Sequence, residues 1–448
     1  MKEELYKKME QMFPLMAHRY QEVSPIELTV CQLARGNTFN MRVIGLEAIK
    51  RFRAEHLDCA ITFKPNHLSE ADFLLLSLLF RENNMRVLTE GGSNLFIEHI
   101  DIFKDILPLF INPAFRQHLA DDLTMSLADY LTTRGAFKLF REPQTLQTGD
   151  GENVTIGKKD ILSLIRAYRQ HLVQQKEMYV TFPGYSSVKT GFMDFIKKDD
   201  IKTGRSYTGK FDGFHHLPFQ MDIEASLATG VDIYVVDVNI AYAPVLEDEN
   251  FVELLRMQEA GVSKNKIYLK DLGYIVETLC RDKHKGELSI KFGKPQKIDT
   301  TSLKDPFLSR KIKTSAQSLA QKTFDLSQTM QPVFPANIYF WAFDEQFNRL
   351  SIRDMKEKID DIRDHLRHLL WGKNQRRVDL HYLLDYRNHI YSADEIINRT
   401  FDLFNNRHKQ ITARDGDMFV IYNQHVAMQY RNHIAHFMES MNVKKKKG

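Results

Sequence analysis

Short β-branched runs alternate with helical stretches from residue 27 to about residue 300, and this alternation limits the fold more than any other feature of the chain. Residues 59–63 and 85–88 are predicted strands, and residues 70–80 between them are a predicted helix. Residues 177–182 and 231–243 are further predicted strands. The second is almost continuous in Val, Ile and Tyr, which indicates burial on both faces. Strands that alternate with helices predict an α/β layer architecture.

The chain has 448 residues, a length that suits two or three domains. Periodicity is lost over residues 294–306, and little strand signal follows, so a boundary is expected there. The expected segments are an N-terminal helical segment 1–45, an α/β domain 46–300, a helical C-terminal domain 301–442 and a basic tail 443–448. In the C-terminal domain, helices are expected over residues 309–328, 344–370, 393–407 and 418–440.

Both ends of the chain have two open interpretations. Residues 1–24 are predicted as an amphipathic helix, because Leu5, Met9, Met12 and Met16 recur at spacings of three and four. This helix either packs on the body of the protein or lies at a membrane interface. The tail of four lysines before Gly448 is either solvated or in contact with anionic lipid.

Charge and cysteine content exclude several classes of protein. The formal net charge is +4, which is too small to imply a nucleic-acid partner by itself. The cysteines Cys31, Cys59 and Cys280 form no Cys-x-x-Cys pair, so neither a disulfide framework nor a structural zinc site is expected. A reducing, cytosolic setting follows from this cysteine usage. No run of 18 apolar residues is present, and no transmembrane helix is predicted.

The sharpest local pattern is a histidine and an aspartate, His67 and Asp72, where a predicted strand ends and a helix begins. The carboxylate of Asp72 can accept a hydrogen bond from one ring nitrogen of His67 and fix its tautomer. The other ring nitrogen is then placed to act as a general base. The alternative is an ordinary capped helix start, since this spacing is common.

Two basic segments are candidate phosphate sites. Residues 134–141 combine Gly135 with Lys138 and Arg141, and the alternative interpretation is an ordinary basic loop. Residues 202–210 combine glycines, hydroxyl side chains and cations, among them Arg205, Ser206 and Lys210. Backbone N–H groups, hydroxyls and a guanidinium suit a phosphate group. The alternative for this second segment is a surface turn.

Taken in order, these segments resemble the glycerolipid acyltransferase family, in particular its glycerol-3-phosphate acyltransferase branch. The matching blocks are residues 66–73 (Asn-His-Leu-Ser-Glu-Ala-Asp-Phe), 91–95 (Gly-Gly-Ser-Asn-Leu), 135–141 (Gly-Ala-Phe-Lys-Leu-Phe-Arg), 204–210 (Gly-Arg-Ser-Tyr-Thr-Gly-Lys), 235–242 (Val-Val-Asp-Val-Asn-Ile-Ala-Tyr) and 290–295 (Ile-Lys-Phe-Gly-Lys-Pro). Residues 430–436 (Tyr-Arg-Asn-His-Ile-Ala-His) are similar to a segment of the long glycerol-3-phosphate branch. The resemblance implies an acyltransferase-type mixed sheet flanked by helices.

The resemblance also implies a reaction and a site. His67, oriented by Asp72, is expected to deprotonate the sn-1 hydroxyl of glycerol 3-phosphate, which attacks the acyl thioester of coenzyme A or acyl carrier protein. The phosphate contacts are expected from Lys138, Arg141, Arg205, Ser206 and Lys210. No metal, no cofactor and no covalent enzyme intermediate is expected. Because the product is lipid-like, the expected location is the cytoplasmic face of a membrane, with peripheral attachment.

The third block departs from the family pattern. The family has a Phe-Pro-Glu-Gly run directly before its arginine, whereas here residues 182–184 (Phe-Pro-Gly) stand about 20 residues before Arg205. The positions that match the glutamate hold Gly184 and Lys202. Two alternatives therefore stay open. One is the same chemistry on dihydroxyacetone phosphate or 1-acylglycerol 3-phosphate, and the other is a catalytically silent, lipid-binding homologue.

Overall fold

The computed structural model describes only part of the chain. The described residues are 40–69, 72–92, 136–139, 144–147, 153–183, 214–245, 248, 253, 257, 260–262, 266, 270, 286–301, 308–343, 348–371, 378–404, 411–435 and 437–438. The predicted N-terminal helix over residues 1–24 and the basic tail lie outside this part.

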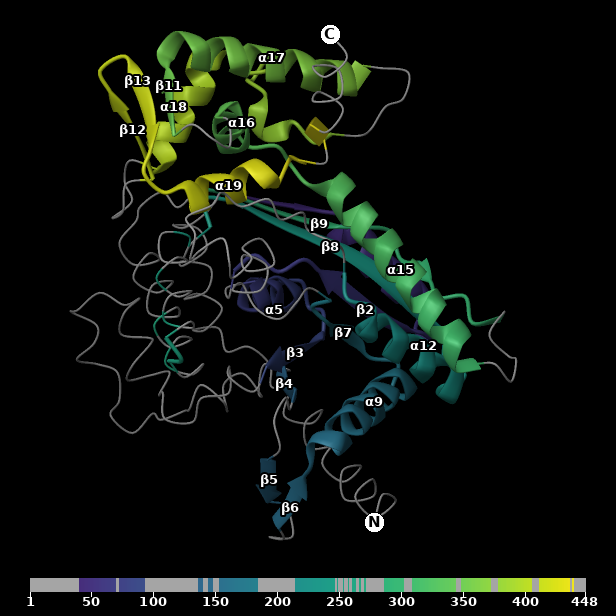
Figure 1. Ribbon diagram of the computed structural model, residues 1–448. Helices are drawn as coiled ribbons and strands as arrows, with labels where there is room; N and C mark the ends of the chain where they lie inside the picture. The colour runs from purple at the N-terminus through teal and green to yellow at the C-terminus, as the bar shows by residue number, and fades with distance from the viewer. Residues whose placement is uncertain are drawn as a thin grey trace, which may run out of the picture.

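A mixed, mostly parallel sheet forms the centre of the molecule and confirms the α/β prediction (Figure 1). Its order is β1 (Asn40–Ile44), β9 (Glu287–Phe292), β8 (Ile233–Ala243), β2 (Ala60–Pro65), β7 (Met178–Val180), β3 (Leu88–Gly92) and β4 (Ala136–Leu139), and β10 (Gln296–Lys297) pairs with β8. The five strands from β8 to β4 are parallel to one another. β1 and β9 are parallel to each other, and β9 is antiparallel to β8.

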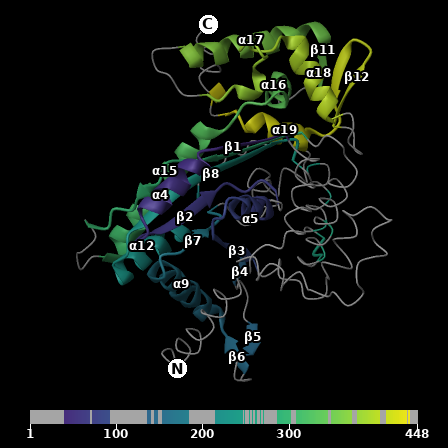
Figure 2. The same cartoon turned by 180° about the vertical axis from the view of Figure 1, so that it is seen from behind.

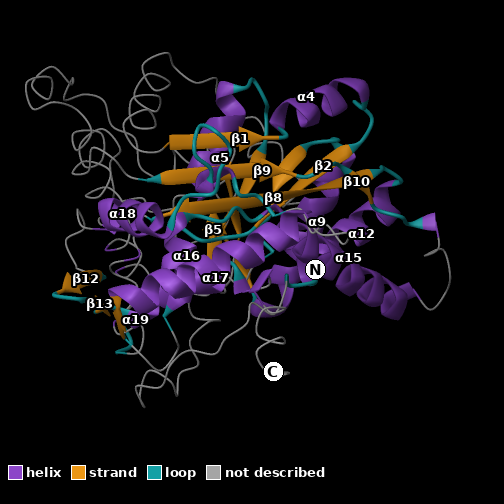
Figure 3. Ribbon diagram, turned by 90° about the horizontal axis from the view of Figure 1, so that it is seen from above, coloured by secondary structure: helices purple, strands orange, loops and turns teal. Residues whose placement is uncertain are grey.

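Helices cover both faces of this sheet. Successive side chains of each strand point to opposite faces, and those of β8 are buried on both. On one face, α4 (Leu46–Glu55) and α5 (Asp72–Glu82) pack on Val236, Val238 and Ile240 of β8. On the other face, α9 (Lys158–Gln174), α12 (Leu217–Thr229) and α15 (Leu308–Met330) pack on Ile233 and Val235. Seen from above, α4 lies on one side of the sheet, and α12 and α15 lie on the other (Figure 3). As the sequence predicts, β8 is buried on both faces.

A smaller unit with its own core follows α15. Its helices are α16 (Pro335–Ala342), α17 (Ile352–Trp371), the 3-10 helix η5 (His381–Leu383), α18 (Ala393–Phe404) and α19 (Gln424–Asn432). It also contains a small antiparallel sheet of β11 (Arg349–Ser351), β13 (Met418–Ile421) and β12 (Thr412–Asp415). A separate hairpin of β5 (Gln144–Gln147) and β6 (Asn153–Ile156) projects away from the central sheet (Figure 2).

Three expectations differ from the structure. Residues 40–44, assigned to the N-terminal helical segment, form β1, because Met41 and Val43 pack against the core of the sheet. The helix predicted over residues 418–440 begins instead as strand β13. The C-terminal region is therefore not purely helical. Helix α15 packs on the sheet, so its contacts cross the predicted boundary at residue 300, and that domain division stays a prediction.

The C-terminal unit is fixed to the end of β8. The buried Tyr430 of α19 accepts a hydrogen bond from the backbone N–H of Val245 at 2.8 Å and donates one to Asp248. The ring of Tyr430 stacks on Phe340 of α16, with centroids 5.7 Å apart. Figure 1 shows α16 to α19 grouped above this end of β8. The strand that runs through the centre of the sheet is thus held from outside at its carboxyl end.

Polar side chains line the contact between β8 and α15. Asn239 donates to the Ser327 carbonyl oxygen at 3.2 Å and to Gln331 Oε1 at 3.1 Å. Asp237, which is 1% exposed, accepts from Gln296 Nε2 at 3.3 Å. Burial raises the pKa of Asp237 to about 7, although Thr323 and Lys322 act in the opposite direction. The folded protein therefore holds this carboxyl group where the charged form is disfavoured.

Replacement of Asp237 by asparagine is expected to stabilise the protein at pH 8 and not at pH 4. Above about pH 7 the folded state must bury the charge of Asp237, and the unfolded state exposes it to water. The cost, on the order of a few kcal/mol, is present in full above about pH 7, decreases as pH falls from 7 towards 3.8, and is lost below 3.8, where both states are protonated. Urea unfolding of both proteins across this range measures the difference. A gap that is the same at pH 4 and pH 8 would contradict it.

Candidate active site

The turn after the central strand β2 is tied to the neighbouring strand by an asparagine. The backbone N–H of Asn66 donates to the Val238 carbonyl oxygen at 3.2 Å. The Asn66 side chain donates to the Ile240 carbonyl oxygen at 2.8 Å and accepts from the Ile240 N–H at 2.7 Å. Its amide thus satisfies both backbone groups of one residue of β8, as a further strand residue would. The position of His67, the next residue, follows from this anchor.

The carboxylate of Asp72 organises the rest of the turn. Its Oδ2 accepts from the backbone N–H of Leu68 at 2.7 Å, the N–H of Ser69 at 3.0 Å and Nδ1 of His67 at 2.9 Å. Its Oδ1 accepts from the Tyr242 hydroxyl at 2.5 Å. Four donors therefore converge on one fully buried carboxylate. Asp72 also lies in the first turn of α5, where the helix dipole favours negative charge.

His67 reaches from this buried carboxylate to the surface. Its side chain is 12% exposed, whereas the side chain of Asp72 is 0% exposed. Because a carboxylate only accepts hydrogen bonds, Nδ1 of His67 is the donor, and in the neutral ring Nε2 carries the lone pair. The ring packs against Phe182, with centroids 4.8 Å apart. The arrangement is that of an oriented general base, and the contact expected between His67 and Asp72 is present.

A charged network lies beneath this turn, on the opposite face of β2. Lys64 pairs with Asp222 of α12 at 2.6 Å, and Arg169 of α9 pairs with Asp222 at 2.5 Å and with Glu90 of β3. All four groups are buried. Burial lowers the pKa of Lys64 to about 8, against the opposing effect of Asp222. Although burial alone would raise it, Lys64 and Arg169 hold the pKa of Asp222 below its ordinary value.

The strand register places Lys138 at the same edge of the sheet as His67. Phe63 of β2 pairs with Val180, which pairs with Thr89, which pairs with Ala136 of β4. Lys138 is thus level with Pro65, three strands away, at about 14 Å for a strand spacing of ~4.8 Å. Arg141 follows two residues after β4 ends and lies outside the described residues.

The remaining predicted phosphate ligands, Arg205, Ser206 and Lys210, lie outside the described residues. They belong to the segment between residues 183 and 214, and both ends of that segment are described. The backbone N–H of His215 donates to the Pro183 carbonyl oxygen at 2.8 Å. Pro183 follows Phe182, which contacts His67. Pro183 and His215, which flank this segment, therefore lie together next to Phe182, which contacts His67.

Two residues of this site were not assigned a role from the sequence. Asn66 was part of the motif around His67, and Tyr242 was the last residue of the block over residues 235–242. The role of each depends on β8 lying next to β2, which the sequence alone did not establish. An asparagine directly after a strand was the available signal for Asn66, because its amide can replace backbone groups.

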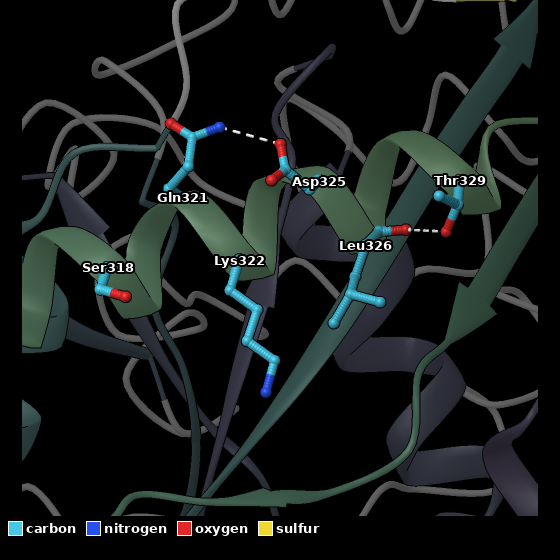
Figure 4. Close-up of a pocket in the computed structure, with 6 residues that line it drawn as sticks. All are labelled: Ser318, Gln321, Lys322, Asp325, Leu326 and Thr329. Atoms are coloured by element: carbon cyan, nitrogen blue, oxygen red, sulfur yellow. Dashed lines mark hydrogen bonds between the residues drawn. The ribbon is translucent and has the colours of Figure 1, made fainter.

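A cavity of about 510 Å³ lies elsewhere, on the outer face of α15. Figure 4 shows its lining, which comes from this single helix and consists of Ser318, Gln321, Lys322, Asp325, Leu326 and Thr329. Gln321 donates to Asp325 at 2.8 Å, so these polar groups bond along the helix. An open surface on one helix lacks the converging groups from several elements that ligand sites show, and we assign it no role.

No family model matches this chain, and no curated protein matches it. None of the helices in the described part of the chain is both long enough and apolar enough to cross a membrane. The geometry around His67 and the residue pattern of the blocks are therefore the features that bear on function.

Proposed function

We propose that this protein is an acyltransferase that moves a fatty acyl group from a thioester of coenzyme A or acyl carrier protein to the sn-1 hydroxyl of glycerol 3-phosphate. The observation that carries the proposal is the pairing of the partly exposed His67 with the buried Asp72 at the end of the central strand. The acyltransferase-type sheet is part of the same proposal.

The proposed reaction uses His67 twice. Its Nε2 accepts the proton of the attacking hydroxyl while the oxygen forms a bond to the thioester carbonyl carbon. When the tetrahedral intermediate collapses, the carbon–sulfur bond breaks, and the imidazolium returns the proton to the leaving thiolate. Asp72 holds the ring in one tautomer and stabilises its charged form. The acyl group passes directly from donor to acceptor, so the enzyme must hold both in line.

The parallel strands support the assignment of the acceptor's phosphate. Lys138 follows the register of β4 to the edge where His67 lies, and the segment with Arg205, Ser206 and Lys210 starts and ends beside Phe182 and Pro183. Ligands of open α/β sheets bind at the carboxyl ends of the strands. We therefore propose that these cations and Arg141 bind the phosphate at this edge, with the protein attached peripherally to the cytoplasmic face of a membrane.

The test is the release of free thiol and the formation of lipid product by the purified protein. Glycerol 3-phosphate, dihydroxyacetone phosphate and 1-acylglycerol 3-phosphate are offered separately, each with coenzyme A and carrier-protein donors. We expect turnover that depends on glycerol 3-phosphate. Turnover with only one of the other acceptors would correct the acceptor and keep the chemistry. Silence with every pair of substrates would overturn the proposal in favour of a lipid-binding protein.

A further inference from the structure

The carboxylate that orients His67 is itself held by a residue from a distant part of the chain. Tyr242 is 170 residues from Asp72, and its hydroxyl donates to Asp72 Oδ1 at 2.5 Å. This distance is at the short end of the range for a hydroxyl that donates to a carboxylate. The two oxygens of Asp72 have separate tasks, since Oδ2 accepts from His67 and from the backbone of the turn while Oδ1 accepts from Tyr242.

Tyr242 is well placed to hold this carboxylate still. Its side chain is 0% exposed, and it belongs to the core that α4 and α5 share with the sheet. Its strand is bonded on one side to Asn66, through Ile240, and on the other side to β9, where Tyr242 pairs with Leu288. Three residues further on, Tyr430 holds Val245. The backbone that carries the Tyr242 hydroxyl is therefore fixed before and after it.

We propose that Tyr242 is a positioning residue of the His67–Asp72 pair. Its hydroxyl fixes the rotation of the Asp72 carboxylate, so that Oδ2 faces Nδ1 of His67, and it disperses part of the carboxylate's charge. The proposal rests on the proposed function in so far as His67 is a base in acyl transfer. The hydrogen-bond coupling itself does not depend on which reaction the site performs.

Loss of this hydroxyl has two separable consequences. The buried Oδ1 loses its donor and the carboxylate keeps three of its four hydrogen bonds, so the alignment of the base is less defined, which lowers turnover. The charge also concentrates on the remaining acceptor, Oδ2, which then attracts the protonated ring more strongly. Half-protonation of His67 should therefore occur at a higher pH. In the described residues, the titratable groups that the structure places in contact with Asp72 are His67 and Tyr242.

The test compares Tyr242→Phe with wild type in steady-state kinetics over a range of pH. We expect kcat to fall about 10- to 100-fold with KM within twofold, because the base is misaligned and substrate binding is untouched. The acid limb of kcat/KM should move to higher pH. The matched control is Tyr234→Phe, the same change on the same strand, where the ring contacts Phe52 instead of the site. This control should show wild-type kcat and the wild-type pH profile.

A second variant separates positioning from simple loss of packing. Incorporation of 2,3-difluorotyrosine at position 242 keeps the ring and makes the hydroxyl a stronger donor, so the acid limb should move to lower pH, opposite to Tyr242→Phe. NMR titration of the His67 ring in wild type, Tyr242→Phe, Tyr234→Phe and the difluorotyrosine protein should give midpoints in the same order as the acid limbs of kcat/KM. This readout needs no turnover. If no protein releases thiol while the midpoints shift as stated, the proposed function fails and the coupling stands.

Two results would overturn the inference. One is a Tyr242→Phe protein that is folded and has the kcat and the His67 titration of wild type. The other is a pair of Tyr242 variants whose His67 midpoints both equal that of wild type while kcat falls, which would leave Tyr242 with a purely structural role.

Discussion

Replacement of His67 by alanine is expected to lower the rate of acyl transfer by about 10²- to 10⁴-fold, the range that a general base supplies. His67 is the one member of the pair that reaches the surface, with 12% of its side chain exposed against 0% for Asp72. The acceptor hydroxyl can therefore meet the imidazole and not the carboxylate. Without the ring, proton removal from the hydroxyl falls to water. Thiol release at saturating acceptor measures the change.

The fold should tolerate this change, since the backbone of the turn is held by Asn66 and by the N–H groups of Leu68 and Ser69. The matched control is His389→Ala. His389 also faces an aspartate, with Nδ1 3.6 Å from Asp385 Oδ2, but its side chain is 74% exposed and lies in the C-terminal unit. We expect wild-type rates from this control. A folded His67→Ala protein with wild-type activity would remove His67 from the mechanism.

Replacement of Arg169 by methionine is expected to cost about 3–5 kcal/mol in free energy of unfolding, as does removal of one partner from other buried ion pairs. The guanidinium is buried between Asp222, at 2.5 Å, and Glu90. Methionine fills much of the volume but leaves two buried carboxylates with Lys64 as the remaining cation of the network. Urea unfolding followed by far-ultraviolet circular dichroism measures the loss.

Two further variants test whether charge is the cause. Arg349→Met removes a guanidinium that lies 3.6 Å from Asp415, in a pair whose side chains are 61% (Arg349) and 65% (Asp415) exposed. This change should alter the free energy of unfolding by less than about 1 kcal/mol. Arg169→Met combined with Glu90→Gln removes the charges in a pair and should recover part of the loss. If the double variant is less stable than Arg169→Met alone, packing rather than charge explains the effect.

The strands β2, β7 and β8 could be predicted because their runs of apolar and β-branched residues indicate buried strands, whereas β1 was assigned to a helical segment. Residues 231–243 are nearly continuous in apolar side chains, and β8 occupies Ile233–Ala243 with both faces buried. The C-terminal prediction over residues 418–440 was wrong at its start because apolar residues there fit more than one period. Asp415-Gly416-Asp417 before Met418 was a hairpin signal, and Gly416 adopts a φ of +59°.

For the site, the local part could be predicted and the remote part could not. His67 and Asp72 are five residues apart, so a turn was enough to bring them together. The contact between Tyr242 and Asp72 requires β8 to lie beside β2 in one register, with Lys64 opposite Asp237. Strand order is a property of the whole sheet, and hydrophobic periodicity contains no information about which strands become neighbours.

The bonds between Asn66 and β8 have a consequence for how such a protein can change over evolutionary time. The turn that carries His67 is joined to the middle of the sheet, between β7 and β8, and it opens only if the ladder opens. The segments that carry Arg141 and Arg205 follow other strands of the same edge. For the proposed acyltransferase, insertions such as the 20 or so residues that separate Phe182 from Arg205 can therefore alter the acceptor preference while the contact between His67 and Asp72 keeps its geometry.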